Sequence, residues 1–292
     1  LKQHGQYFEL GAEIIQSAEP KLVQLLETSG NCLVPTAGQS FFWYQNKLTP
    51  QDELQNQPGI DQFLNELQGI EDYQGKDISL AKYFFGKKYF NADMHDVLET
   101  YAGEFGTSAH RLGIKSLLKE EDTWSNLAKN YYSHHPMQNS CEHFFNDVQS
   151  FVKLNTRIIR IDSIQGQLIL TDQTGHQHES DIALLSVPLG VLKANDIVFH
   201  PALPVEKINA IRKLGVDHGI KIVMRFSKRW WPQDMLVAKG GHLCPEYLAS
   251  LTYTKPTLVG FIMGKKALAL KGKSAAELAT LLSKELDSLF KH

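Results

Sequence analysis

The sequence predicts an α/β (α+β) fold, because helical and strand periodicities follow one another along the chain. Between residues 17 and 150, apolar residues recur at helical spacing, as in EPKLVQLLETSG and DQFLNELQGI. Residues 151–187 change to period-two patterns and short apolar runs, with Gly166 and Gly175 where hairpin turns would fall. The last third combines apolar strand-like runs with a long final helix. Together these patterns favour a mixed sheet flanked by helices.

Individual elements follow from the same patterns. We expect residues 151–187 to form a meander of three or four strands, one of which ends at VPLGVLK. The hydroxyl of Ser274 suits the N-cap of a closing helix, SAAELATLLSKELDSLF. Between them we expect a helix from about Val205 to Leu214 and strands over 220–226, 247–253 and 257–263.

Composition excludes several classes of protein. Of the 292 residues, 42% are hydrophobic and 21% are charged, as in globular proteins. The 30 basic and 32 acidic residues give a net charge of -2, which does not favour nucleic acid or a membrane surface as a partner. Cys32, Cys141 and Cys244 are too widely spaced for a disulfide framework or a zinc site. We therefore expect no metal and a reducing, cytoplasmic location.

Lys221 is the most unusual residue of the predicted strands. It interrupts the apolar run of HGIKIVMRFSKRWWP directly after Ile220. One interpretation is functional, since a desolvated ammonium can hold a water molecule or pass a proton near neutral pH. The other is an edge-strand lysine whose long stem carries its charge to water.

Four segments resemble the flavin-containing amine oxidases, the family of monoamine and polyamine oxidases and lysine-specific demethylases. The longest runs from SDIALLSVPLGVLK to HGIKIVMRFSKRWWP, at 180–232. GQYFELGAEI resembles the stretch whose Gly-Ala pair passes beside the flavin, and VKLNTRIIRI resembles a strand of the flavin domain. GFIMGKKALALKGKSAAELATLLSKELDSLF resembles the closing strand, loop and helix. Resembling segments occur along the whole chain, although residues 17–150 match the family only in their helical spacing and short polar breaks.

The resemblance implies oxidative deamination of a primary or secondary amine, with hydride transfer to FAD and reoxidation by oxygen. In this family the lysine corresponding to Lys221 holds a water molecule against the flavin ring, so Lys221 is the expected catalytic residue. Gly11 and Ala12 correspond to the backbone beside the ring, where a larger side chain would block a planar cofactor. Gln16 stands near the expected substrate channel, and a solvated glutamine at a helix start is an equally good interpretation. Whether the substrate is a monoamine, a polyamine or an amino acid stays open.

The resemblance also assigns Ile158, Ser186, Val187 and Pro188 to the adenine and ribose end of FAD. It divides the chain into a flavin-domain edge strand (1–16), the helical part of a substrate domain (17–150), a β-meander slice of the FAD domain (151–195), and the substrate-domain sheet and helices (196–292).

One family feature is missing from the sequence. The 292 residues contain no GxGxxG turn between a strand and a helix, which holds the FAD pyrophosphate. We therefore expect a partial chain that does not retain FAD or turn over alone, and that self-associates through exposed strand edges. The alternative is a standalone binding or interaction protein that keeps the substrate-domain fold without catalysis.

Overall fold

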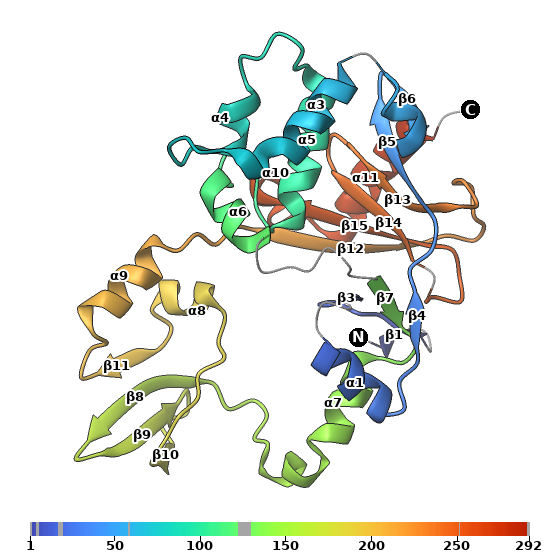
Figure 1. Cartoon of the computed structure of the whole chain (residues 1–292). Coiled ribbons are helices and arrows are strands. Elements are labelled where there is room, and N and C mark those ends of the chain that lie inside the picture. The colour runs from blue at the N-terminus through green and yellow to red at the C-terminus, as the bar shows by residue number, and fades with distance from the viewer. Residues whose placement is uncertain are drawn as a thin grey trace. The chain divides into compact units, whose positions relative to one another are not determined.

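The computed structural model describes residues 2–3, 6–16, 20–57, 59–121, 130–250 and 252–290 (Figure 1). Contacts divide the chain into two compact units, Leu1–Phe144 together with Asp217–His292, and Phe145–Val216. Each unit is described by itself. The mixed α/β character agrees with the fold class expected from the sequence.

A six-stranded mixed sheet forms the centre of the larger unit. Its strand order is β12-β15-β14-β13-β5-β6, so β12, which carries Lys221, is an edge strand. Neighbouring strands are antiparallel except β13 and β5, which run parallel. The strands are β5 (Gln39–Tyr44), β6 (Lys47–Pro50), β12 (Gly219–Arg225), β13 (Met235–Lys239), β14 (Glu246–Ser250) and β15 (Thr257–Met263).

Two C-terminal helices, α10 (Gly264–Leu270) and α11 (Ala275–Leu289), pack against one face of this sheet. Leu282 and Leu286 of α11 are buried in one cluster with Tyr247 and Leu258 of the sheet. A capping box begins α11: the Ser274 hydroxyl accepts the backbone N–H of Glu277, whose carboxylate accepts the backbone N–H of Ser274. The predicted N-cap is therefore confirmed.

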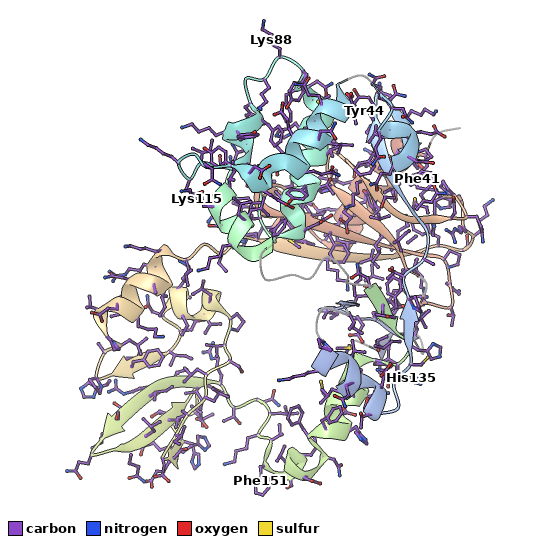
Figure 2. All side chains as sticks on the ribbon, in the orientation of Figure 1. Phe41, Tyr44, Lys88, Lys115, His135 and Phe151 are labelled. Atoms are coloured by element: carbon purple, nitrogen blue, oxygen red, sulfur yellow. The ribbon has the colours of Figure 1, made fainter. Side chains whose placement is uncertain are left out.

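A second core belongs to the helical layer of the same unit. β5 contributes to both cores because its side chains alternate: Phe41 joins the α11 core and Tyr44 joins the helical core (Figure 2). The helices of this layer are α2 (Gln51–Leu54), α3 (Ile60–Gln68), α4 (Leu80–Phe84), α5 (Ala92–Glu104) and α6 (Ile114–Glu121), with a 3-10 turn at Gly69–Asp72.

A three-stranded sheet with order β3-β7-β4 completes the larger unit, beside a two-stranded ribbon of β1 (Lys2–Gln3) and β2 (Gln6–Tyr7). Its members are β3 (Ile14–Gln16), β4 (Leu33–Pro35) and β7 (Asn130–Ser133), accompanied by helices α1 (Pro20–Thr28) and α7 (Met137–Phe144). The expectation of a mostly helical 17–150 is thus wrong in part, since β4, β5, β6 and β7 fall within it. Short apolar runs such as QSFFWY do not distinguish a strand from a buried helix by spacing alone.

The smaller unit contains the predicted meander. Strands β8 (Ile158–Ile164), β9 (Gln167–Asp172) and β10 (Gln177–Ser180) pair in antiparallel order, with turns at Gly166 and Gly175, both at positive φ. β11 (Val198–His200) pairs parallel to β8, and helices α8 (Leu189–Ala194) and α9 (Val205–Lys213) contact each other. A 3-10 turn at Asn146–Phe151 precedes the sheet.

Residues 181–188 correct one expectation. The strand expected to end at VPLGVLK is not formed, because no described strand pairs with this segment. A strand needs a partner for its backbone groups, so an apolar run without one stays irregular. Leu184 is 95% exposed here.

Among the described residues, no helix has both the length and the apolarity to cross a membrane.

Candidate functional site

Lys221 lies in the middle of β12, directly opposite Phe261 of β15. Its neighbours Ile220 and Ile222 pack against the core beneath α11, so alternation turns the lysine to the opposite face of the sheet. Only 11% of its side chain is exposed. β12 is an edge strand, as the surface-lysine interpretation requires, yet the ammonium is paired with protein groups rather than carried into water.

Two groups from the N-terminal segment hold this ammonium. Lys221 Nζ lies 2.7 Å from Oε2 of Glu13 and donates a hydrogen bond to the Gly11 carbonyl oxygen at 3.1 Å. The contact with Glu13 is an ion pair whose angle is not that of a hydrogen bond, and Oε2 makes no hydrogen bond to another described residue. The segment before β3 is thereby attached to the edge of the large sheet.

Glu13 was not singled out from the sequence, although its side chain is only 3% exposed. The Ser250 hydroxyl donates to its Oε1 atom at 3.0 Å, so both carboxylate oxygens meet a positive or donor group. Charged groups are seldom buried unless they are paired. A lone glutamate after a Gly-Ala pair carries no local pattern, which explains why sequence reasoning missed it.

Two tyrosines surround this ion pair. Burial raises the pKa of the Tyr132 phenol, and the negative charges of Glu13 and Glu246 raise it further. Burial and the charge of Glu13 likewise raise the pKa of Tyr253. Both phenols therefore stay protonated near neutral pH. Tyr132 is fully buried, and its hydroxyl has no hydrogen-bond partner among the described residues.

The sheet continues this site across three further strands. Phe261 lies opposite both Lys221 and Glu246, and Glu246 lies opposite Lys239 of β13. We call these four side chains the charged row. Directly opposite residues in a sheet project to the same face, about 4.8 Å apart from strand to strand. Glu104 of α5 ends the row, since its Oε1 atom lies 2.5 Å from Lys239 Nζ.

The remaining predicted residues lie in two places. Gly11 and Ala12 precede β3, and a Cβ atom added at Gly11 would meet no atom within 4 Å, so the space beside this backbone is open. Gln16 ends β3, but its side chain lies outside the described residues. The other four belong to the smaller unit: Ile158 begins β8, Ser186 and Val187 lie in the irregular segment, and Pro188 is the N-cap of α8.

Among the described residues one group has the composition of a metal site. His95, Glu99 and His110 bring their nitrogen and oxygen atoms within 4.8 Å of one another. His95 and Glu99 are four positions apart on α5, with Nε2 and Oε1 separated by 3.8 Å. This group is remote in sequence from the charged row and was not expected from the sequence.

Comparison with known proteins decides the family. The family described as "Flavin containing amine oxidoreductase" matches residues 1–292, the whole chain. The chain belongs to this family. The resemblance to flavin amine oxidases seen in the sequence is thereby confirmed, and the family's cofactor is a flavin.

Individual relatives of the chain are polyamine oxidases and lysine-specific histone demethylase homologues. Polyamine oxidase 2 of Arabidopsis thaliana is 28% identical over 211 residues, which cover 67% of this chain and 42% of the relative. Polyamine oxidase 5 of Oryza sativa subsp. japonica is 32% identical over 142 residues, which cover 47% of this chain and 29% of the relative. The chain therefore spans less than half the length of these relatives.

Solved structures of low identity share the fold. A putrescine oxidase bound to putrescine matches 99% of this chain and 72% of its own, with a TM-score of 0.78 at 15% identity. Cyclohexylamine oxidase from Brevibacterium oxydans matches 97% of this chain and 70% of its own, with a TM-score of 0.75 at 15% identity. These likenesses establish the amine-oxidase fold for this member of the family.

Proposed function

We propose that this chain supplies the substrate side of an FAD-dependent amine oxidase, with Lys221 as the residue that acts beside the flavin ring. The observation that carries the proposal is the largely buried ammonium of Lys221, held by Glu13 at 2.7 Å and by the Gly11 carbonyl at 3.1 Å. Membership of the family supplies the reaction class. When bound, FAD accepts a hydride equivalent from the α-carbon of the amine.

The role of Lys221 follows from its donors. An ammonium has three N–H groups in three different directions. The Gly11 carbonyl accepts one of these N–H groups and Glu13 lies beside the ammonium as an ion pair, so an N–H remains to hold a water molecule. Such a positioned water, or the ammonium itself, provides a proton path near the reacting centre, and water also hydrolyses the imine product.

The other groups of the site assist by shape and by excluding water. Phe261 places its ring centroid 5.5 Å from Lys221 Nζ and covers the strand beside it. The open backbone at Gly11 would lie against the flavin ring. We further propose that Gln16 lies near the substrate channel and that Ile158, Ser186, Val187 and Pro188 lie along the adenine and ribose end of FAD.

Stopped-flow absorbance of the flavin-loaded enzyme tests the proposal. Lys221→Met should slow flavin reduction or reoxidation by about 10²–10⁴-fold, the scale for losing a positioned proton-transfer group. Lys228→Met, at an exposed lysine beyond the same strand, is the matched control and should change neither rate. Both rates within about threefold of wild type in Lys221→Met would refute the role of Lys221.

A second candidate function is a binding protein that keeps this fold without catalysis. The 292 residues contain no GxGxxG turn, whose backbone N–H groups hold the pyrophosphate of FAD in such folds, so uptake of FAD is the property that separates the two candidates. The flavin absorbance spectrum of the purified protein distinguishes the two. Bound flavin that bleaches on anaerobic addition of an amine supports the oxidase, whereas protein that takes up no FAD supports the binding protein.

A further inference from the structure

Together with Glu13 and Glu104, the two carboxylates that contact its lysines, the charged row holds more negative than positive charge. Lys221 is paired with Glu13, and Lys239 is paired with Glu104. Glu246 lies between these pairs, and among the described residues its carboxylate makes no ion pair and no side-chain hydrogen bond. Two ammonium groups thus meet three carboxylates, and the excess negative charge rests on Glu246.

The environment of Glu246 makes this excess charge unfavourable. Burial raises the pKa of the Glu246 carboxyl; Lys239 opposes this effect and Glu104 adds to it. Lys239 is itself drawn to Glu104, the partner it contacts at 2.5 Å. A partly buried carboxylate without its own counter-ion is stabilised by any cation that reaches it.

The row also has the form of a binding surface. Phe261 separates Lys221 from Glu246, and its ring offers an apolar face to methylene groups and a π face to a cation. Two strand spacings, about 9.6 Å, separate the backbones of Lys221 and Glu246. A ligand lying along the row can therefore place one amine group near Lys221 and a second near Glu246.

We infer that Glu246 is the binding point for a second, remote ammonium group of the substrate, so that the site selects diamines or longer polyamines over monoamines. This inference rests on the proposed function for the reacting end of the ligand. It assigns recognition of the second charge to one residue of β14. The alternative is that Glu246 only balances Lys239 and plays no part in ligand selection.

Equilibrium binding measured by calorimetry tests the inference without flavin. Linear diamines of increasing length and n-alkylamines of matched length are titrated into the 292-residue chain. We expect at least one diamine to bind about 10-fold or more tightly than its monoamine, the scale of one charge-assisted hydrogen bond. Glu246→Gln should remove this preference, because the diamine loses the contact of its second ammonium group. Glu53→Gln, the same change at an exposed carboxylate of α2, is the control and should keep the preference.

Glu104→Gln provides a second variant for the case in which Glu246→Gln does not fold. It frees Lys239 to pair with Glu246, so it too should weaken diamine binding. Wild-type protein that binds no diamine, or binds both amines equally, overturns the inference, as does an unchanged preference in a folded Glu246→Gln. Since binding is read without FAD, failure of amine oxidation would be seen separately, as flavin that is not reduced by a diamine that binds.

Discussion

The Nζ atom of Lys221 and the Oε2 atom of Glu13 lie 2.7 Å apart, and little of either side chain is exposed. The pair joins the N-terminal segment to the edge strand of the central sheet. Neither residue can be changed alone without leaving a poorly solvated charge in the protein. The substitution of Lys221 therefore has a structural consequence as well as a catalytic one.

We predict strong thermodynamic coupling between these two residues. Lys221→Met and Glu13→Gln should each lower the free energy of unfolding by about 3 kcal/mol, because each leaves the partner charge buried and unpaired. The double variant should be more stable than the sum of the single effects predicts, which urea unfolding followed by tryptophan fluorescence will measure. A matched cycle at the more exposed pair Lys87 and Glu66 should give a coupling below about 1 kcal/mol. Additive effects at Lys221 and Glu13 would show that their ion pair contributes nothing.

A second prediction concerns acid sensitivity of the smaller unit. Hydrogen bonds from Thr174 hold the pKa of Asp172 far below its usual range, with further contributions from His178 and His176. Because the folded-state pKa is depressed, this stabilisation is complete above the unfolded value of about 3.9 and is lost as the pH falls through the folded value.

Asp172→Asn should therefore lower the unfolding temperature near pH 7. The difference in unfolding temperature between the variant and wild type should be smaller at about pH 2. Thermal unfolding followed by circular dichroism at both pH values measures it. Asp181→Asn, the same change at an exposed aspartate of the same unit, is the control and should leave the unfolding temperature near that of wild type at pH 7. An equal difference in unfolding temperature between Asp172→Asn and wild type at both pH values would contradict a stabilising role for the ionised Asp172 carboxylate.

Thiol reactivity gives a third prediction. Cys32 and Cys141 are free and exposed, whereas Cys244 is buried and donates its S–H to the Glu246 carbonyl at 3.1 Å. Burial raises the pKa of the Cys244 thiol, which suppresses the reactive thiolate. A thiol-disulfide reagent should modify two cysteines in native protein and the third only after unfolding. Rapid modification of Cys244 in folded protein would contradict this burial.

The fourth prediction concerns self-association. Large apolar side chains of the smaller unit are exposed, including Phe151 at 79% (Figure 2) and Ile182 at 83%. Such surfaces promote association between chains. Light scattering of the isolated chain should show mass growing with concentration, and Ile182→Asp combined with Leu184→Asp should reduce this growth. A concentration-independent monomer in the wild type would refute it.

Local sequence decided the elements whose signals are local. Ser274 and Glu277 form a capping box because they are three positions apart, and Gly166 and Gly175 adopt positive φ because the chain must turn there. Of the expected strand over 220–226, residues 220–225 lie in β12, as their β-branched content indicates. The apolar run of β5 was too short to show a period, so the prediction of a mostly helical segment over 17–150 was wrong there.

Pairings between distant segments were decided only by tertiary structure. The sequence singled out Lys221 and the Gly11–Ala12 step, but it did not indicate that Glu13 would meet the lysine or that Ser250 would donate to Glu13. Nor did it indicate that Glu246 would stand between two satisfied ion pairs. Strand pairing and register bring these residues together from distant parts of the chain, and the spacing of residues in the sequence does not indicate such contacts. For the same reason 181–188 has strand-like residues but no strand, since β structure requires a partner as well as a pattern.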